Sequence, residues 1–143
     1  MPAKYFFDSE SALVVVQFTG TMSGTDLQRI DAMVMADPEA MGRVFELSDL
    51  RLVTASTLTT LDLDASARRW SAHYESTSLK KFAMVAPQDL TFGQSRMYVA
   101  FAQERPYETR VFRDAEEAEA WFDIPSGSAD RLISRDPRGN AAP

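Results

Sequence analysis

The sequence contains no cysteine and a single histidine, His73. The absence of cysteine excludes disulfides, thiolate zinc sites and cysteine nucleophiles. One imidazole is too few for a histidine metal site, and a catalytic triad would need an activated nucleophile beside it. No Walker A or dinucleotide-binding motif is present either. We therefore expect no metal, no cofactor and no catalytic residue, and we interpret His73 as a surface or boundary residue.

Long apolar runs and an excess of positive charge are also missing. No run approaches the roughly 20 apolar residues of a membrane-spanning helix, and the opening MPAKYFFDSE lacks the apolar core of a signal peptide. The net charge is −6, and the densest basic clusters are the pairs Arg68–Arg69 and Lys80–Lys81. Nucleic-acid binding relies on broader basic patches. The sequence therefore predicts a cytoplasmic protein with no transmembrane segment and no nucleic-acid partner.

What the sequence does contain is the pattern of one α/β domain. Its 143 residues are 45% hydrophobic and 25% charged, which suits a single globular domain with its own core. Short β-branched or apolar runs predict strands at about residues 4–8, 12–19, 44–50, 81–86 and 108–113. Helical spacing predicts helices at about 23–37, 61–75, 92–104 and 115–122, the third with a capping box from Thr91 to Gln94.

The predicted order is ββαβαβαβα. Strands joined by helices are expected to be parallel with right-handed crossovers, which gives a mostly parallel five-stranded sheet with one antiparallel strand at the start. That first strand would lie at an edge, so a homodimer through residues 4–8 is an open alternative. We assign residues 1–122 to the domain. Residues 123–143 carry few bulky apolar side chains and are predicted to be a poorly packed tail in which Leu132 and Ile133 dock weakly.

Five segments together resemble a known family. They are KYFFD, VVVQFTG, FELSDLR, AMVAPQDLTFGQSRMY and VFRDAEEAEAWF, and they span about residues 4–122. In these segments the chain resembles the bacterial SpoIIAA-like proteins, relatives of the STAS domain (sulfate transporter and anti-sigma-factor antagonist). The resemblance implies a single α/β domain with no cofactor and no recognised catalysis, so we do not expect an enzyme.

The resemblance also implies a candidate modification site. STAS antagonists carry an Asp-Ser-Ser-Gly motif after the third strand, and its second serine is phosphorylated to break binding to an anti-sigma factor. Laid on this sequence, the motif falls at TAST, residues 54–57, where Ser56 matches the phospho-acceptor and the other three positions differ. From the residues alone, we interpret the hydroxyl side chains of this segment as turn and helix-capping groups.

Sites in open α/β sheets lie at the carboxyl ends of strands. We therefore expect a protein partner to bind where the third and fourth strands lead into helices, with hydroxyl groups giving polar contacts and aromatic or methionine side chains giving apolar area. We call this the binding rim, and its predicted members are Thr54, Ser56, Thr57, Phe92, Gly93, Arg96, Met97 and Tyr98.

The alternative is a carrier of a small apolar or lipid-like ligand with peripheral membrane contact. Methionine and aromatic side chains would line its crevice, and Arg96 would hold an acidic head group. The predicted crevice residues are Met33, Trp70, Phe101 and Tyr107, with Met35 as a further candidate. A contiguous cavity would favour the carrier, whereas a filled core beneath a flat rim would favour the protein partner. We interpret four acidic residues near strand ends as turn and capping groups rather than a catalytic pair: Asp49, Asp62, Asp64 and Asp89.

Overall fold

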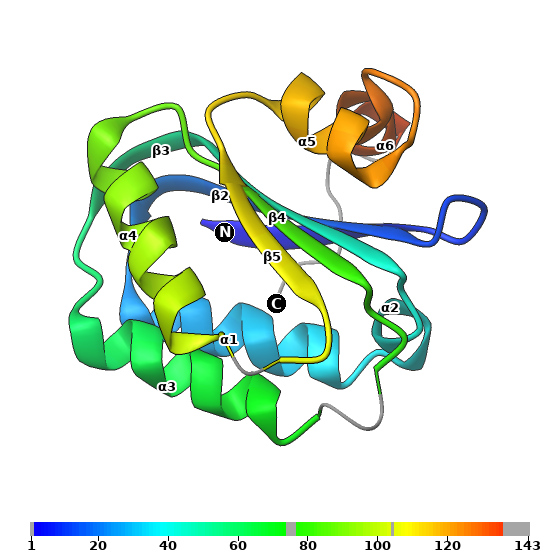
Figure 1. Ribbon diagram of the computed structural model, residues 1–143. Helices are drawn as coiled ribbons and strands as arrows, with labels where there is room; N and C mark the ends of the chain where they lie inside the picture. The colour runs from blue at the N-terminus through cyan, green and yellow to red at the C-terminus, as the bar shows by residue number, and fades with distance from the viewer. Residues whose placement is uncertain (1, 74–76, 104, 136–143) are drawn as a thin grey trace.

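The computed structural model describes residues 2–73, 77–103 and 105–135. Within these ranges the elements follow one another as Figure 1 shows. They are β1 (Ala3–Asp8), β2 (Leu13–Met22), α1 (Gly24–Met35), α2 (Pro38–Met41), β3 (Phe45–Ser56), α3 (Thr60–Ser71), β4 (Lys81–Val85), α4 (Asp89–Phe101), β5 (Glu108–Phe112), α5 (Ala115–Phe122) and α6 (Ser128–Arg135).

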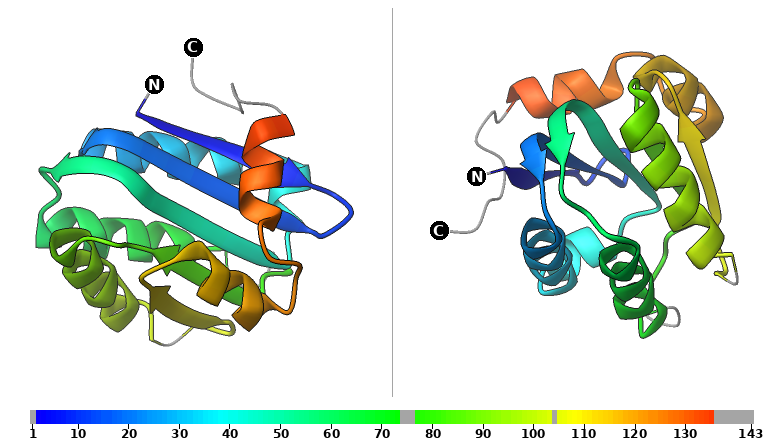
Figure 2. Two further views of the ribbon diagram at one scale, coloured as in Figure 1. Left: turned by 90° about the horizontal axis from the view of Figure 1, so that it is seen from above. Right: turned by 90° about the vertical axis from the view of Figure 1, so that its left-hand side faces the viewer.

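The strands form one five-stranded sheet in the order β1-β2-β3-β4-β5. The β1–β2 hairpin is antiparallel and the other three pairs are parallel, as the sequence predicted. Because each parallel connection moves one strand further in the same direction, the connecting helices α1, α3 and α4 all lie on one face (Figure 1). The second face carries α5 and α6, and Figure 2 shows α6 across the sheet from α1 and α3.

Side chains of β2 alternate between two apolar cores. Val14 and Val16 pack in the core under α1, α3 and α4, whereas Leu13 and Val15 pack in the core under α5 and α6. A strand covered on both faces needs apolar residues at successive positions, which explains the unbroken run. The strand then continues past its predicted end, because Gly20 adopts a φ of 71° at a register shift that keeps β2 paired with β3 as far as Met22.

Two helices, α3 and α4, differ from their predicted bounds by three residues or more. Helix α4 begins at Asp89 rather than residue 92, with Gln88 as an N-cap that makes no side-chain bond. Thr91 therefore does not form a capping box. It lies inside the first turn, buried, and its hydroxyl donates to the Gln88 carbonyl. Helix α3 ends at Ser71, and the last predicted positions of that helix, residues 74 and 75, lie outside the described residues.

The poorly packed tail is the largest correction. Residues 128–135 form α6, whose Ala129 and Leu132 are buried against the second core. The buried Glu119 carboxylate accepts hydrogen bonds from the backbone amides of Gly127 and Ala129 at the start of this helix. Together with the short helix α2, α6 raises the number of helices in the described residues above the predicted four. Residues 136–143 lie outside the described residues.

Candidate functional site

The two segments assigned to the binding rim lie side by side. The Gln94 side-chain amide on α4 donates to the Leu58 carbonyl in the β3–α3 loop at 3.3 Å. Further along α4, the Met97 sulfur lies 3.7 Å from the Thr60 hydroxyl at the start of α3. Since β3 and β4 are parallel neighbours, their carboxyl ends share one edge of the sheet, and the helices that follow meet there.

Ser56 occupies the end of a strand rather than a helix start. β3 runs six residues past its predicted end, so Thr54 and Ser56 belong to it. Ser56 is paired with Met22 of β2 and its hydroxyl accepts from the Leu58 amide. The N-cap of α3 is Thr59, which forms a full capping box with Asp62. The prediction that Ser56 and Thr57 lie at the helix start is therefore wrong, because the capping box already occupies that position.

The apolar members of the rim differ in exposure. Met97 is 40% exposed, whereas Tyr98 is 6% exposed and packs edge-to-face on Phe82 in the core. Phe92 is half-buried beneath the Arg113 guanidinium, 3.9 Å from the ring centroid. Tyr98 is therefore removed from the surface rim. Gly93 and Arg96 are exposed on the outer side of α4, and a side chain added at Gly93 would meet open space.

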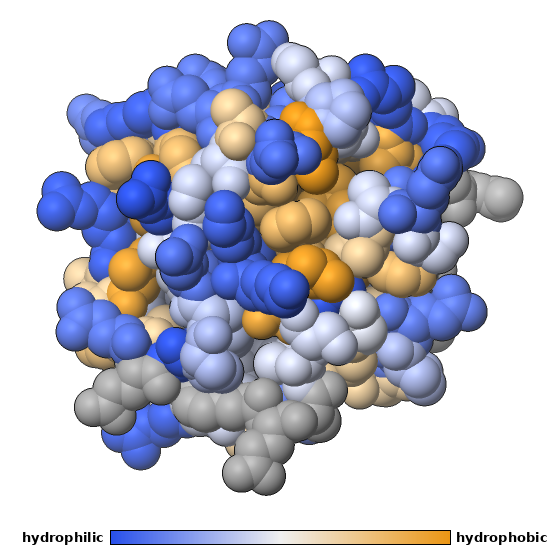
Figure 3. Space-filling view, turned by 45° about the vertical axis from the view of Figure 1, so that its right-hand side comes forward, coloured by the Kyte–Doolittle hydropathy of each residue, from blue (hydrophilic) through white to orange (hydrophobic). Residues whose placement is uncertain are grey.

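Three exposed apolar residues near the rim were not singled out for it. Leu61 on α3 is 79% exposed, Leu90 on α4 is 56% exposed and Phe101 is 39% exposed. Residues 90, 97 and 101 recur at helical spacing on one side of α4, the side whose Gln94 and Met97 contact the β3–α3 region. We call Leu61, Leu90, Met97 and Phe101 the apolar strip. Figure 3 shows apolar side chains gathered near the middle of one face of the molecule, with hydrophilic side chains around them.

The predicted crevice is not formed as a unit. Met33 is half-buried against the first core, Phe101 faces the surface, and the Tyr107 hydroxyl is bonded to Arg105. Trp70 and Met33 line two different hollows, Trp70 the cavity described in the next paragraph and Met33 a shallow one beside Arg29. Arg96 is exposed and does not line the cavity that contains Trp70, so it cannot hold an acidic head group there.

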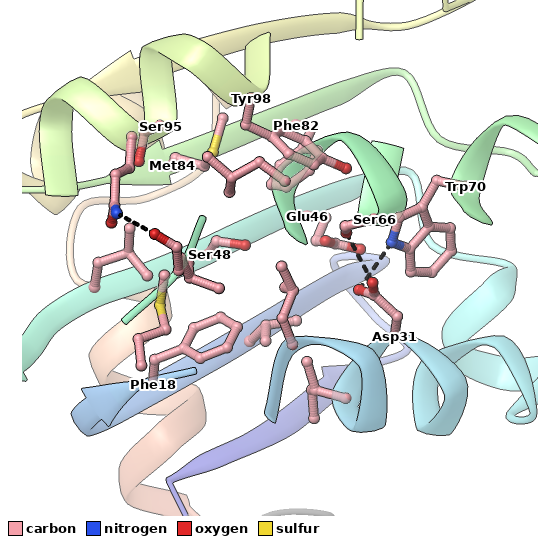
Figure 4. A pocket seen from close by; sticks show the side chains of 18 of the residues that line it. Phe18, Asp31, Glu46, Ser48, Ser66, Trp70, Phe82, Met84, Ser95 and Tyr98 are labelled. Carbon is pink, nitrogen blue, oxygen red and sulfur yellow. Dashed lines mark hydrogen bonds between the residues drawn. The ribbon is translucent and has the colours of Figure 1, made fainter. Parts of the chain in front are cut away.

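A different cavity lies between the sheet and helices α1, α3 and α4 (Figure 4). Its volume is about 60 Å³. Most of its wall is aliphatic, aromatic or methionine, but several polar side chains also line it. These polar residues are Asp31, Glu46, Ser48, Ser66, Gln94 and Ser95. No sequence pattern indicates this cavity, because its polar members come from β3, α1, α3 and α4 and meet only in the folded chain.

Comparisons with known proteins identify the fold. A scan against protein-family models and a search of curated proteins found no match. Among solved structures, an uncharacterized protein of the DUF3478 family with a SpoIIAA-like fold, from Shewanella loihica PV-4, superposes with a TM-score of 0.52 at 16% identity, over 77% of this chain and 83% of that one. The anti-sigma factor antagonist SpoIIAA in its unphosphorylated form superposes with a TM-score of 0.51 at 12% identity, over 83% and 94%. The chain has the SpoIIAA-like fold.

Within this SpoIIAA-like fold, a buried carboxylate joins two helices beside the cavity. Asp31 on α1 accepts from the Ser66 hydroxyl at 2.7 Å, from Arg69 Nη2 at 2.7 Å and from Trp70 Nε1 at 3.0 Å. Burial raises the pKa of Asp31, while these three hydrogen bonds from α3 oppose the rise. The labelled side chains of Figure 4 show Asp31, Ser66 and Trp70 converging at one end of the cavity.

Two buried arginines lie beside the same cavity of the SpoIIAA-like fold. The buried Arg43 donates to Glu46 at 2.6 Å and its guanidinium lies 5.0 Å from the Trp70 ring centroid. Arg105 is also buried and donates to the hydroxyls of Tyr98 and Tyr107 and to the Ala67 carbonyl. Burial raises the pKa of Tyr98. Arg43 is thus paired with a carboxylate, and Arg105 donates to three neutral oxygens.

The four acidic residues near strand ends serve as ion pairs or caps. Asp49 pairs with Arg51 of its own strand, and Asp64 pairs with Arg68 one helical turn away. Asp62 completes the capping box described above, and Asp89 pairs with Arg113. Over the described ranges, no group of three histidine or acidic side chains is placed to hold a metal ion. None of the helices in those ranges is both long and apolar enough to cross a bilayer.

Proposed function

We propose that the chain is a non-catalytic regulatory domain that recognises a protein partner through the binding rim. The observation that carries this proposal is the apolar strip, which lies beside exposed polar groups at Thr57 and Arg96. Exposed aliphatic, aromatic and methionine side chains with a polar surround are typical of protein interfaces. The anti-sigma factor antagonist that shares this fold supports a protein partner over a substrate.

Ser56 remains a candidate point of control for that interaction. It is half-buried at the end of β3, one residue before the exposed Thr57. A phosphoryl group would add about −1.5 to −2 charges at the border of the apolar strip, which opposes burial of that surface in an interface. Incubation with kinases of the native host followed by mass spectrometry tests this step, and an unmodified Ser56 while partner binding is being regulated would remove it.

Native mass spectrometry of the protein purified from its own host tests the function itself. We expect a co-purifying protein with the unmodified chain and its loss in the Leu61→Asp and Met97→Asp variants. Leu52→Asp is the matched control, because Leu52 is 54% exposed on β3 outside the apolar strip. Since all three positions are on the surface, each variant should keep its fold. A complex that persists in both apolar-strip variants would contradict the proposal.

The cavity beneath α3 and α4 favours a second function, the carriage of a small ligand. With a volume of about 60 Å³, it has room for only a few water-sized groups. A long acyl chain needs more space than this, so the lipid-like ligand and the peripheral membrane contact gain no support from the cavity. In the native experiment, a co-purifying small molecule in place of a protein would favour this second function.

A further inference from the structure

The cavity between the sheet and α1, α3 and α4 contains polar groups that the fold itself does not satisfy. The Gln94 side-chain oxygen is buried and has no hydrogen-bond partner among the described residues. Ser48 on β3 and Ser95 on α4 are 8% and 4% exposed, and both line the cavity. No other described residue forms a hydrogen bond with either hydroxyl. Buried polar groups normally have partners, so the Gln94 oxygen, together with the two serine hydroxyls that line the same space, offers hydrogen bonds to a bound molecule.

The charges around the cavity restrict what that occupant can be. Both acidic residues of the wall are already paired, Asp31 with Arg69 and Glu46 with Arg43. An anionic ligand would meet these two carboxylates with no cationic side chain in the cavity lining to balance it. A cationic ligand would have to leave water for carboxylates whose charge is already neutralised. The electrostatics therefore favour a neutral molecule.

The remaining wall of the cavity limits the size of the bound molecule and favours an aliphatic part in it. Apart from the polar groups, the lining is apolar, with Phe18, Leu50 and Met84 among its members. An apolar wall stabilises an aliphatic segment by removing it from water. A volume of about 60 Å³ corresponds to about four to six water-sized positions, since one water needs about 10–15 Å³ by this measure.

We propose that the cavity is a binding site for a small neutral molecule that carries a hydroxyl or carboxamide group on a short aliphatic segment. Its polar group exchanges hydrogen bonds with Ser48, Ser95 and the Gln94 oxygen, and its aliphatic part lies against the apolar wall. The exposed rim residues Thr57, Arg96 and Met97 do not line this cavity. Binding of a small molecule here can therefore be measured without any protein partner.

A matched set of probes tests the proposal on the whole chain. Isobutyramide and isobutanol are neutral, whereas isobutyrate and isobutylammonium have nearly the same shape and carry opposite charges. Titration of the isotope-labelled protein, followed by amide and methyl NMR shifts, measures each affinity. We expect saturable millimolar binding of the neutral pair with shifts confined to cavity residues, and binding of each charged probe at least tenfold weaker. Equal or tighter binding of isobutyrate would overturn the proposal, as would the absence of saturation for both neutral probes.

Variants then locate the site. Ser95→Leu fills the cavity and should abolish binding, while the same enlargement on the outside of α4, Ala100→Leu, should leave it unchanged because Ala100 is exposed. The gentler Ser48→Ala/Ser95→Ala pair keeps the space but removes two hydroxyls, so isobutyramide should bind about tenfold more weakly. The gentler pair keeps the test decisive if Ser95→Leu fails to fold. Unchanged affinity in the double variant would place the probe elsewhere and refute the assignment.

Discussion

Replacement of Glu119 by glutamine tests how α6 is held on the sheet. Glu119 is 1% exposed, and its two carboxylate oxygens accept from the Gly127 amide at 2.9 Å and from the Ala129 amide at 2.8 Å. Glutamine has the same shape but only one acceptor oxygen. In Glu119→Gln one backbone amide would keep a neutral acceptor, and the other would face the new side-chain NH₂ group in a buried site.

The expected loss of stability follows from these two changes. A hydrogen bond to a charged group contributes about 1.5–3 kcal/mol, and a buried donor left unsatisfied costs about 1–3 kcal/mol, so we expect the free energy of unfolding to fall by about 3 kcal/mol. For a domain of this size that is a drop in Tm of about 10 °C. Urea denaturation measures the free energy, and hydrogen exchange at the Gly127 and Ala129 amides localises the loss. Glu116→Gln, exposed on the same helix, is the control and should change stability by less than about 0.5 kcal/mol. Equal urea midpoints for the two variants would refute the reasoning.

Three further predictions concern other buried or capping groups. Asp31→Ala leaves three donors of α3 without their acceptor and should lower the free energy of unfolding by about 3 kcal/mol in urea denaturation; a loss below about 1 kcal/mol would contradict it. Thr59→Ala removes half of the capping box with Asp62 and should lower the free energy of unfolding by about 1 kcal/mol in the same assay. An unchanged free energy would contradict a capping role for Thr59. The hydrogen bond from Ser11, helped by Arg135, lowers the pKa of Asp8 below its unfolded value of 3.8. The stabilisation of the folded state by ionised Asp8 is present above pH 3.8 and is lost as the pH falls through the lower pKa of the folded state. The free energy of unfolding of Asp8→Asn should therefore fall less steeply in acid than that of the unmodified chain, and identical pH profiles would contradict this prediction.

The sheet could be predicted because its strands are encoded locally. Residues 13–16 are apolar at every position, which only a strand covered on both faces requires, and the alternation of strands with helical patterns then leaves few possible connections. The proximity of the β3–α3 loop and α4 could also be predicted, since the carboxyl ends of adjacent parallel strands share an edge. The Gln94–Leu58 contact confirms that proximity.

What could not be predicted depends on contacts between elements distant in sequence. The segment 123–135 reads as a tail because few of its residues are bulky and apolar, yet a single buried carboxylate on α5 binds the start of α6. Thr91 has the sequence spacing of a cap but faces the core. Tyr98 reads as interface material, whereas the neighbouring Arg105 and Phe82 hold it inside. Sequence spacing gives the period of a helix, but the neighbours of each face decide which residues are buried.

Gln94 lies between the two proposed sites. Its side-chain nitrogen donates to the Leu58 carbonyl in the β3–α3 loop, beside the binding rim. Its side-chain oxygen is buried with no hydrogen-bond partner in the described part of the chain, and the residue lines the cavity. A ligand that bonds this oxygen would fix the amide in the orientation that the loop contact requires, because both atoms belong to one planar group. The contact with the β3–α3 loop and the proposed ligand contact therefore depend on the same Gln94 rotamer. Any effect of one site on the other through this residue needs only that rotamer to be populated differently, without movement of the sheet or of α4.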